Sequence, residues 1–225
     1  MDTARDSPDQ PPSSAAQRVA DLLRERIVKG DIPPGGRIVE RKLSAELAVS
    51  RTPVREALKV LQADGLLEIS MHRGAQVTAF SAREAEDLFE TIGAMESLAA
   101  QRLAERMRPG VLDRLEALHV RNLDLHAAQD AAAYFDVNSE IHDIIVEEAG
   151  NTVLRDSRRR LLARARRGRY LAIMRPERWR EAVEEHERLM AALRAGDAPA
   201  AGAVWMRHLS RTGTTVAELL RQKGL

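Results

Sequence analysis

The pattern of hydrophobic and polar residues predicts two short helices at residues 43–63. Leu43–Leu47 is expected to form the first helix, because the next helical pattern follows after only Ala48–Ser50, which leaves room for a tight turn. Ser50 or Thr52 is expected to cap the second helix, with Pro53 at its first position, where the missing N–H of proline does no harm. Its buried stripe consists of residues at helical spacing, Val54, Ala57, Leu58 and Leu61.

The period of the pattern changes after Asp64-Gly65, which ends the second helix. Leu67 and Ile69 alternate with polar residues before a turn at residues 71–74, and Val77 follows the turn. An alternation interrupted by a turn is typical of a β-hairpin. Two helices joined by a tight turn and followed by a hairpin predict a winged helix-turn-helix.

The rest of the chain shows helical patterns after a polar start. Residues 1–14 are rich in proline, serine and aspartate and nearly lack hydrophobic residues, so a flexible tail is expected there. Residues 15–29 form an amphipathic pattern that ends at Gly30. Ser81 and Glu84 have the spacing of a capping box and begin a series of further helices. These helices are predicted at about residues 81–107, 109–128, 131–149, 151–174, 176–195 and 198–222.

Short connections between these helices make neighbouring helices antiparallel, so the C-terminal part is predicted to be a bundle. The expected fold class is mainly α: an N-terminal winged helix-turn-helix with a small β-hairpin wing, followed by an all-α antiparallel helical bundle. The first domain would span residues 15–80 and the second residues 81–225, with the boundary at Phe80-Ser81.

Composition narrows the functional class. The chain of 225 residues has a formal net charge of +1, so any binding to nucleic acid must depend on a local basic surface. It contains no cysteine, which excludes disulfides and suits a reducing cytoplasm. No hydrophobic run is long enough to cross a bilayer, and no charged-then-apolar leader precedes the first helix. We expect a soluble, cytoplasmic protein that does not contact membranes.

Basic and hydroxyl side chains gather where a winged helix-turn-helix meets DNA. The start of the second helix, which meets base edges in the major groove, carries Ser50, Arg51, Thr52 and Arg55. A guanidinium matches the O6 and N7 acceptors of guanine, and hydroxyls suit phosphate oxygens. Each charge alone could be an ordinary solvated one, but their coincidence favours DNA binding. Further contacts are expected from the first helix and the hairpin tip, at Arg41, His72, Arg73 and Gly74.

Three helices of the predicted bundle each direct one histidine towards the interior. His142 shares a hydrophobic helical face with Asn138, and His186 and His208 lie on hydrophobic stripes of later helices. Neutral imidazoles from separate helices suit a divalent ion such as Zn²⁺ or Ni²⁺, with positions left for water or a ligand carboxylate. The alternative is three hydrogen-bonded core histidines. We favour the metal because no such pattern surrounds the other histidines, His72, His119 and His126.

Arginines crowd residues 155–169, between the first and second of these histidines. Most of them are expected to face water. Arg158 and Arg169 fall on the hydrophobic side of the helix, where a guanidinium can bind a carboxylate through two hydrogen bonds. We therefore expect an organic acid as a ligand of the bundle interior.

The second helix and its surroundings resemble a known signature. The run LAVSRTPVREAL at residues 47–58, followed by Gly65-Leu66 and Arg73-Gly74, resembles the DNA-binding signature of the GntR family of bacterial transcription regulators. Ala48 stands where that family usually has glycine. The resemblance implies that operator DNA is contacted from the positions of Arg41, Arg51, Thr52, Arg55 and Gly74.

The histidines resemble a second part of the same family. In its FadR-type branch a helical effector-binding (FCD) domain follows the DNA-binding domain, and metal-binding members hold the ion with an Asp-x-x-x-His pair and two later histidines. Asn138-x-x-x-His142, His186 and His208 match those positions, which implies metal ligands at all four. Asparagine replaces the usual aspartate, and a neutral amide is a weaker ligand, so a loosely held metal is expected.

Together these features predict a sequence-specific transcription regulator and not an enzyme. We expect a homodimer on a palindromic operator, since a two-fold protein matches a two-fold DNA site. An organic acid bound in the helical domain would shift the population competent for DNA. The resemblance favours repression.

Two other functional classes remain as alternatives. One is a metal-dependent enzyme with an appended DNA-binding domain, since three histidines with open positions can activate water. The sequence offers no convincing general base near these histidines, which disfavours it. The other is a purely architectural nucleic-acid-binding protein, which would not need polar residues inside the bundle.

Overall fold

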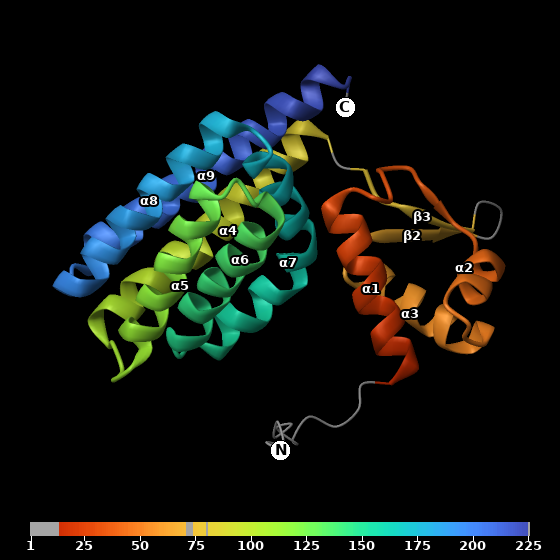
Figure 1. Ribbon diagram of the computed structural model, residues 1–225, viewed down its shortest axis with the longest axis horizontal. Coiled ribbons are helices and arrows are strands. Elements are labelled where there is room, and N and C mark those ends of the chain that lie inside the picture. The colour runs from red at the N-terminus through yellow and green to blue at the C-terminus, as the bar shows by residue number, and fades with distance from the viewer. Residues whose placement is uncertain (1–13, 71–73, 80, 225) are drawn as a thin grey trace, which may run out of the picture. The chain divides into compact units, whose positions relative to one another are not determined.

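The computed structural model describes residues 14–70, 74–79 and 81–224 (Figure 1). The chain divides into two compact units. The N-terminal unit contains the chain up to Ile27 and Asp31–Thr78, and the helical unit contains Val28–Gly30 and Ala79–Leu225. Nearly all of the predicted tail, and Phe80 at the predicted domain boundary, lie outside the described residues.

The N-terminal unit is a winged helix-turn-helix, as predicted (Figure 1). Its three strands form an antiparallel sheet in the order β1-β3-β2. The sequence did not predict β1, because a strand of two residues is too short to show alternation. The elements are α1 (Ala15–Lys29), β1 (Arg37–Ile38), α2 (Glu40–Glu46), α3 (Arg51–Ala63), β2 (Leu67–Ser70) and β3 (Gly74–Val77).

The helix-turn-helix differs from its prediction at the helix starts. α2 begins at Glu40, three residues before the predicted start. α3 begins at Arg51, so Pro53 is its third residue and not its first. The first four backbone N–H groups of a helix have no partner within that helix, so the missing N–H of proline does no harm at this position either. Ser50 is the N-cap of α3 without a side-chain capping bond. In the turn, Ala48 has φ of 51°, the left-handed conformation that glycine adopts without strain.

The helical unit is the predicted bundle, and the predicted capping box of Ser81 and Glu84 begins it. α8 and α9 run side by side in Figure 1, and α4 packs along α9. No described helix combines the length and hydrophobicity needed to cross a membrane. The helices are α4 (Ala82–Glu105), α5 (Val111–Ala127), α6 (Ala131–Glu148), α7 (Thr152–Ile173), α8 (Pro176–Ala195) and α9 (Ala198–Gln222).

Two of the hydrophobic clusters of this bundle lie along α4 and α9. One surrounds Phe89, where α4 and α9 approach so closely that a Cβ on Gly213 would lie 2.6 Å from the Cβ of Phe89. The other contains Trp205, whose ring stacks on that of His208 with 4.7 Å between centroids. The second cluster therefore borders the part of the interior in which the predicted histidines lie.

Candidate nucleic-acid groove and candidate metal centre

A groove in the N-terminal unit brings together cations from three elements. It has a volume of about 490 Å³. Its basic side chains, which we call the basic groove, come from β1, α2 and α3 and are Arg37, Arg41, Arg51, Arg55 and Lys59. All of them are exposed, so their charges can reach a ligand as large as a DNA backbone.

Glu40 is the carboxylate of this groove and joins two of its arginines. The Nε of Arg55 donates to Glu40 Oε2 over 2.8 Å, and Arg51 Nη2 lies 3.9 Å from the same oxygen. Exposed ion pairs of this kind contribute at most about 1 kcal/mol, so they do not prevent either guanidinium from binding DNA. The shared carboxylate places the two guanidinium groups next to each other at the start of α3.

The predicted DNA-binding residues fall into three groups. Those that line the groove are Arg41, Arg51, Arg55 and Gly74. Those that are exposed at the start of α3, beside the lining, are Ser50 and Thr52. Those that lie outside the described residues are His72 and Arg73. Gly74 has φ of 71°, a conformation that favours glycine at the foot of the hairpin turn.

The sequence analysis did not include two cations of the groove among the DNA-binding residues. Arg37 lies on β1, the strand that was not predicted. Lys59 follows Arg55 by four residues on α3, so the two share a helical face. Helical spacing could have identified Lys59, whereas Arg37 needed the sheet pairing.

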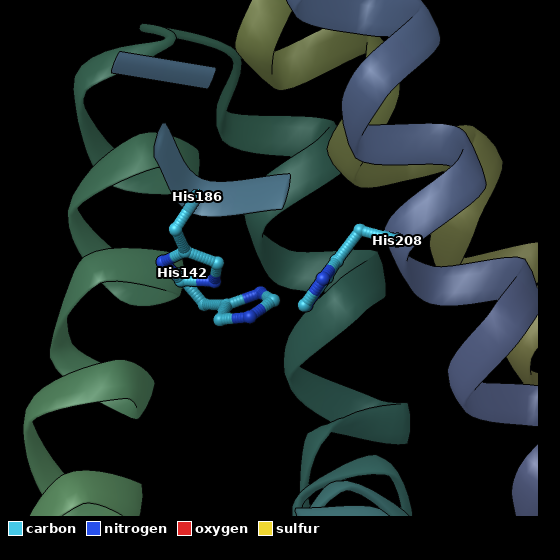
Figure 2. Close-up of side chains that lie close together, drawn as sticks. All are labelled: His142, His186 and His208. Atoms are coloured by element: carbon cyan, nitrogen blue, oxygen red, sulfur yellow. The ribbon is translucent and has the colours of Figure 1, made fainter. Parts of the chain in front are cut away.

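The structure brings three of the predicted metal-ligating residues together in the helical unit. His142 on α6, His186 on α8 and His208 on α9 point towards one another in Figure 2, and one ring nitrogen of each lies within 4.8 Å of the others. We call these residues the histidine cluster. Burial lowers the pKa of each ring below its ordinary value, so the imidazoles are neutral at neutral pH. A neutral imidazole has the lone pair that a metal ion needs.

Two of the three histidines each contact a buried carboxylate of their own. Glu96 Oε2 lies 2.6 Å from His142 Nδ1, and Glu185 Oε2 lies 2.8 Å from His208 Nδ1. These contacts occupy Nδ1 and leave Nε2 as the coordinating atom, as in many metal sites. Among the described residues, neither His142 Nε2 nor either ring nitrogen of His186 has a hydrogen-bond partner.

Both carboxylates are ionised. Burial alone would raise the pKa of Glu96, but Arg158 and His142 hold it well below the usual carboxylate range. Burial likewise opposes ionisation of Glu185, yet His208 and Arg178 lower its pKa to about 2. An ionised carboxylate accepts the Nδ1 proton and fixes the orientation of the ring.

Asn138 lies one helical turn before His142 and is 3% exposed. Its Oδ1 is buried and has no hydrogen-bond partner among the described residues. An amide oxygen is a weaker ligand than the carboxylate oxygen expected by resemblance, but this one is unpaired and lies on the same helical face as His142. The three neutral, buried imidazoles therefore fit a divalent ion, and Asn138 is the candidate for a fourth ligand.

His119 corrects one expectation. The sequence analysis saw no inward pattern around it, yet His119 on α5 is 3% exposed and its ring centroid lies 6.4 Å from that of His186. Its neighbours at helical spacing, Leu115 and Asn122, are also buried. That spacing could have identified His119 as an interior residue.

The two arginines predicted to bind an organic acid differ in their surroundings. Arg158 donates from Nε to Glu96 over 2.8 Å and from Nη1 to Asp143 over 2.6 Å. Arg169 is 3% exposed, and none of its three guanidinium nitrogens has a partner among the described residues. Burial lowers the pKa of Arg169 to about 10, so it remains a cation at neutral pH.

The sequence analysis also missed the buried arginine Arg178. Its Nη2 donates to Glu185 Oε2 and to the backbone carbonyl of His208, each over 2.8 Å. Both buried carboxylates thus accept from arginine, Glu96 from Arg158 and Glu185 from Arg178 and Arg211. Within the described structure, no carboxylate accepts a hydrogen bond from Arg169.

Comparison with known proteins gives matches over both units. Residues 15–77 match the bacterial regulatory proteins of the gntR family, and residues 87–211 match the FCD domain. The HTH-type transcriptional repressor RspR of Escherichia coli is 26% identical over 94% of this chain and 93% of its own length. The HTH-type transcriptional regulator YdhC of Bacillus subtilis is 27% identical over 60% of each chain. The structure of E. coli McbR/YncC has a TM-score of 0.78 at 23% identity, covering 95% of this chain and 100% of that one, and supports the fold.

Proposed function

The chain belongs to the GntR family of bacterial DNA-binding transcription regulators and carries an FCD domain, and we propose that it represses transcription from a palindromic operator until an organic acid binds the helical unit. Repression is proposed because the E. coli relative RspR is named a repressor. The observation that carries DNA reading is the pair Arg51 and Arg55, exposed side by side at the start of α3. In this motif that position meets base edges in the major groove.

The proposed effector site centres on the histidine cluster. Asn138, His142, His186 and His208 would hold a divalent ion such as Zn²⁺ or Ni²⁺, because their donor groups are neutral and buried. Glu96 and Glu185 orient two of them, His142 and His208. When bound, the ion supplies positive charge that attracts a carboxylate. An amide in place of a carboxylate ligand makes the site weaker than a site with aspartate.

Arg169 is the proposed anion-binding residue of the same interior. A buried guanidinium without hydrogen-bond partners is costly, and a ligand carboxylate would satisfy it with two hydrogen bonds. Arg158 is less available, because Glu96 and Asp143 already accept from two of its nitrogens. We therefore assign the effector carboxylate to Arg169, with Arg158 holding Glu96 in place behind His142.

Catalysis at the histidine cluster is disfavoured by its surroundings. A hydrolytic site needs a carboxylate or another base free to take a proton from water. Within the described structure, Glu96 and Glu185 both accept from a histidine and an arginine, so neither is free. Binding without turnover is the function that this arrangement supports.

Substitution of His186 tests the metal and the response together. His186→Ala should lower the Zn²⁺ content measured by elemental analysis and weaken the effect of organic acids on operator binding. Non-specific DNA binding should keep its salt dependence, because the basic groove is unaltered. His126→Ala, on the half-buried histidine outside the cluster, is the matched control. Unchanged metal content in His186→Ala would remove the metal from the proposal.

The proposed homodimer can be tested by its DNA. Two copies related by a two-fold axis would present two α3 helices to half-sites on successive turns of one DNA face. Sedimentation should give a dimer, and protection of a selected operator should show two half-sites about 10 base pairs apart or a multiple of that. A monomer that protects a single half-site would contradict the proposed dimer, but it would not contradict the assignment of Arg51 and Arg55 to DNA reading.

A further inference from the structure

The groove of the N-terminal unit exposes hydrophobic side chains as well as cations. Val39 is 48% exposed and Ile69 is 39% exposed, and both belong to the lining of the groove. Val60, which is also exposed, lies outside that lining. Single exposed hydrophobic residues are common on protein surfaces, but two of them in one concave site indicate an interaction surface. The cations of the basic groove make a polyanion its occupant, so the two hydrophobic side chains face DNA.

Val39 lies beside the arginines that are assigned to base reading. It is the N-cap residue of α2, and its backbone is extended. The next residue, Glu40, accepts a hydrogen bond from Arg55 Nε over 2.8 Å and lies 3.9 Å from Arg51 Nη2. Consecutive Cα atoms are about 3.8 Å apart, so Val39 starts next to the residue that holds both guanidinium groups. Because Val39 and both arginines line one groove, Val39 meets the base pairs next to those that the arginines contact.

Ile69 continues this hydrophobic surface on β2, at the edge of the sheet. It pairs with Ala75 of β3, and Ala75 pairs with Ile38 of β1. Residues paired in this way share one face of a sheet, and all three line the groove. Ala75 and Ile38 are buried, so Ile69 is the exposed end of a hydrophobic row. Ile38 directly precedes Val39, and two strand spacings separate β1 from β2. Val39 and Ile69 therefore border the groove at positions roughly 10 Å, or about three base pairs, apart.

The chemistry of DNA offers few partners to a hydrophobic side chain at this place. Phosphate oxygens and the polar groups of the base edges bind cations and hydrogen-bonding groups. In the major groove, thymine is the one base that displays an apolar group, its C5-methyl group. A helix-turn-helix places the start of its second helix, here α3, in the major groove. A valine or an isoleucine beside that helix start is therefore more complementary to thymine than to any other base.

We propose that Val39 and Ile69 are specificity residues of the DNA interface, which pack against thymine methyl groups next to the guanines contacted by the arginines of α3. This inference rests on the proposed function, because it takes Arg51 and Arg55 as the residues that read bases. The arginines select guanine through hydrogen bonds, and the two hydrophobic side chains select thymine by removing its methyl group from water. The groove thus recognises two kinds of base with two kinds of side chain.

Replacement of thymine by uracil is the direct test, because deoxyuridine pairs with adenine as thymidine does and lacks only the methyl group. An operator is selected from random DNA with the full-length protein, and each thymine in the protected region is then replaced in turn. Fluorescence anisotropy should give an affinity about three- to fivefold lower for one or more replacements beside a contacted guanine, the value of burying one methyl group. Equal affinity after every replacement, or an operator selected without thymine at these positions, would overturn the proposal.

Val39→Thr and Ile69→Thr then assign the contacts. Threonine keeps the branched Cβ of both residues and is a favoured N-cap residue, so α2 and β2 should keep their structure. Each variant should bring the ratio of affinities for thymine and uracil to about one at the thymine that its residue contacts, and leave the ratio unchanged elsewhere. Val60→Thr, at the exposed valine outside the groove, is the matched control and should keep every ratio. Ratios that persist in both groove variants would overturn the assignment to these residues.

Arg55→Ala separates this inference from the function on which it rests. It should lower the affinity for the operator and keep the ratios of thymine to uracil, because the hydrogen bonds of an arginine do not involve the methyl group. If operator binding depends on Arg55 and no uracil replacement has an effect, base reading by arginine stands and the hydrophobic contacts are wrong. If the full-length protein binds the operator no better than scrambled DNA, base reading itself is wrong and the hydrophobic contacts fall with it.

Discussion

The basic groove and the histidine cluster both gather polar side chains, but one gathers them in water and the other inside the protein. The side chains of Arg51 and Arg55 are 60% and 59% exposed, whereas those of Arg158 and Glu96 are 5% and 2% exposed. Exposed charges are solvated with or without a partner, so these arginines can give up their ion pair with Glu40 and bind DNA instead. Buried charges need fixed partners, because an unpaired one is costly at low dielectric. Substitutions should therefore change binding in the groove and stability in the cluster.

The same substitution in both regions gives the largest expected contrast. Glu96→Gln removes the charge that holds Arg158, His142 and Trp205, and should lower the free energy of unfolding by roughly 3–5 kcal/mol, since a buried cation loses its counter-charge. Glu40→Gln should change the free energy of unfolding by less than about 1 kcal/mol, because its ion pairs are exposed. Urea denaturation followed by circular dichroism measures both. Similar losses would show that the two environments do not differ as described.

The second prediction concerns DNA affinity and not the stability of the fold. Arg55→Ala should weaken binding to a selected operator by roughly 1–3 kcal/mol, the value of a guanidinium contact with guanine. Lys59→Ala, one turn along the same face, should weaken binding to the operator and to scrambled DNA by the same factor. It should also lower the slope of log affinity against log salt concentration by about one. Fluorescence anisotropy at several salt concentrations gives both quantities. Equal weakening of the two DNAs by Arg55→Ala would contradict base reading.

The third prediction concerns the pH dependence of the free energy of unfolding. Burial keeps the pKa of the three clustered histidines below the value near 6.5 of an unfolded chain, so below about pH 6.5 the unfolded state binds more protons. The metal-free protein should therefore have its full stability above that pH. It should lose up to roughly 1.4 kcal/mol per pH unit for each histidine as the pH falls further. His186→Leu should reduce this slope in urea titrations at pH 7.5 and 5.5, whereas Arg51→Ala should not.

The smallest expected effect concerns backbone strain in the N-terminal unit. Ala48→Gly should raise the free energy of unfolding by roughly 0.5–1 kcal/mol, because relief of a left-handed alanine exceeds the added freedom of glycine in the unfolded chain. Operator affinity should be unchanged, since Ala48 lies outside the lining of the groove. Thermal melting and anisotropy check the two parts. A loss of stability would show that the turn relaxes in solution.

The sequence predicted the groove more completely than the surroundings of the cluster. Arg51 and Arg55 follow from the period of one helix, whose buried stripe leaves them outside. The histidines could be assigned to the interior in the same way. Glu96 could not be paired with His142, because 46 residues separate them and their contact depends on how α4 packs against α6. Arg178 was missed for the same reason, whereas the helical spacing of buried residues could have identified His119.

The sequence by itself determined the order of the helices, the hairpin that follows α3 and which face of each helix is hydrophobic, because these depend on residues a few positions apart. Tertiary structure alone decided which buried charge meets which partner, and that no carboxylate of the described residues accepts a hydrogen bond from Arg169. Those relations depend on the register between helices distant in sequence. A hydrophobic period fixes the buried side of a helix, and it says nothing of the neighbour that covers that side.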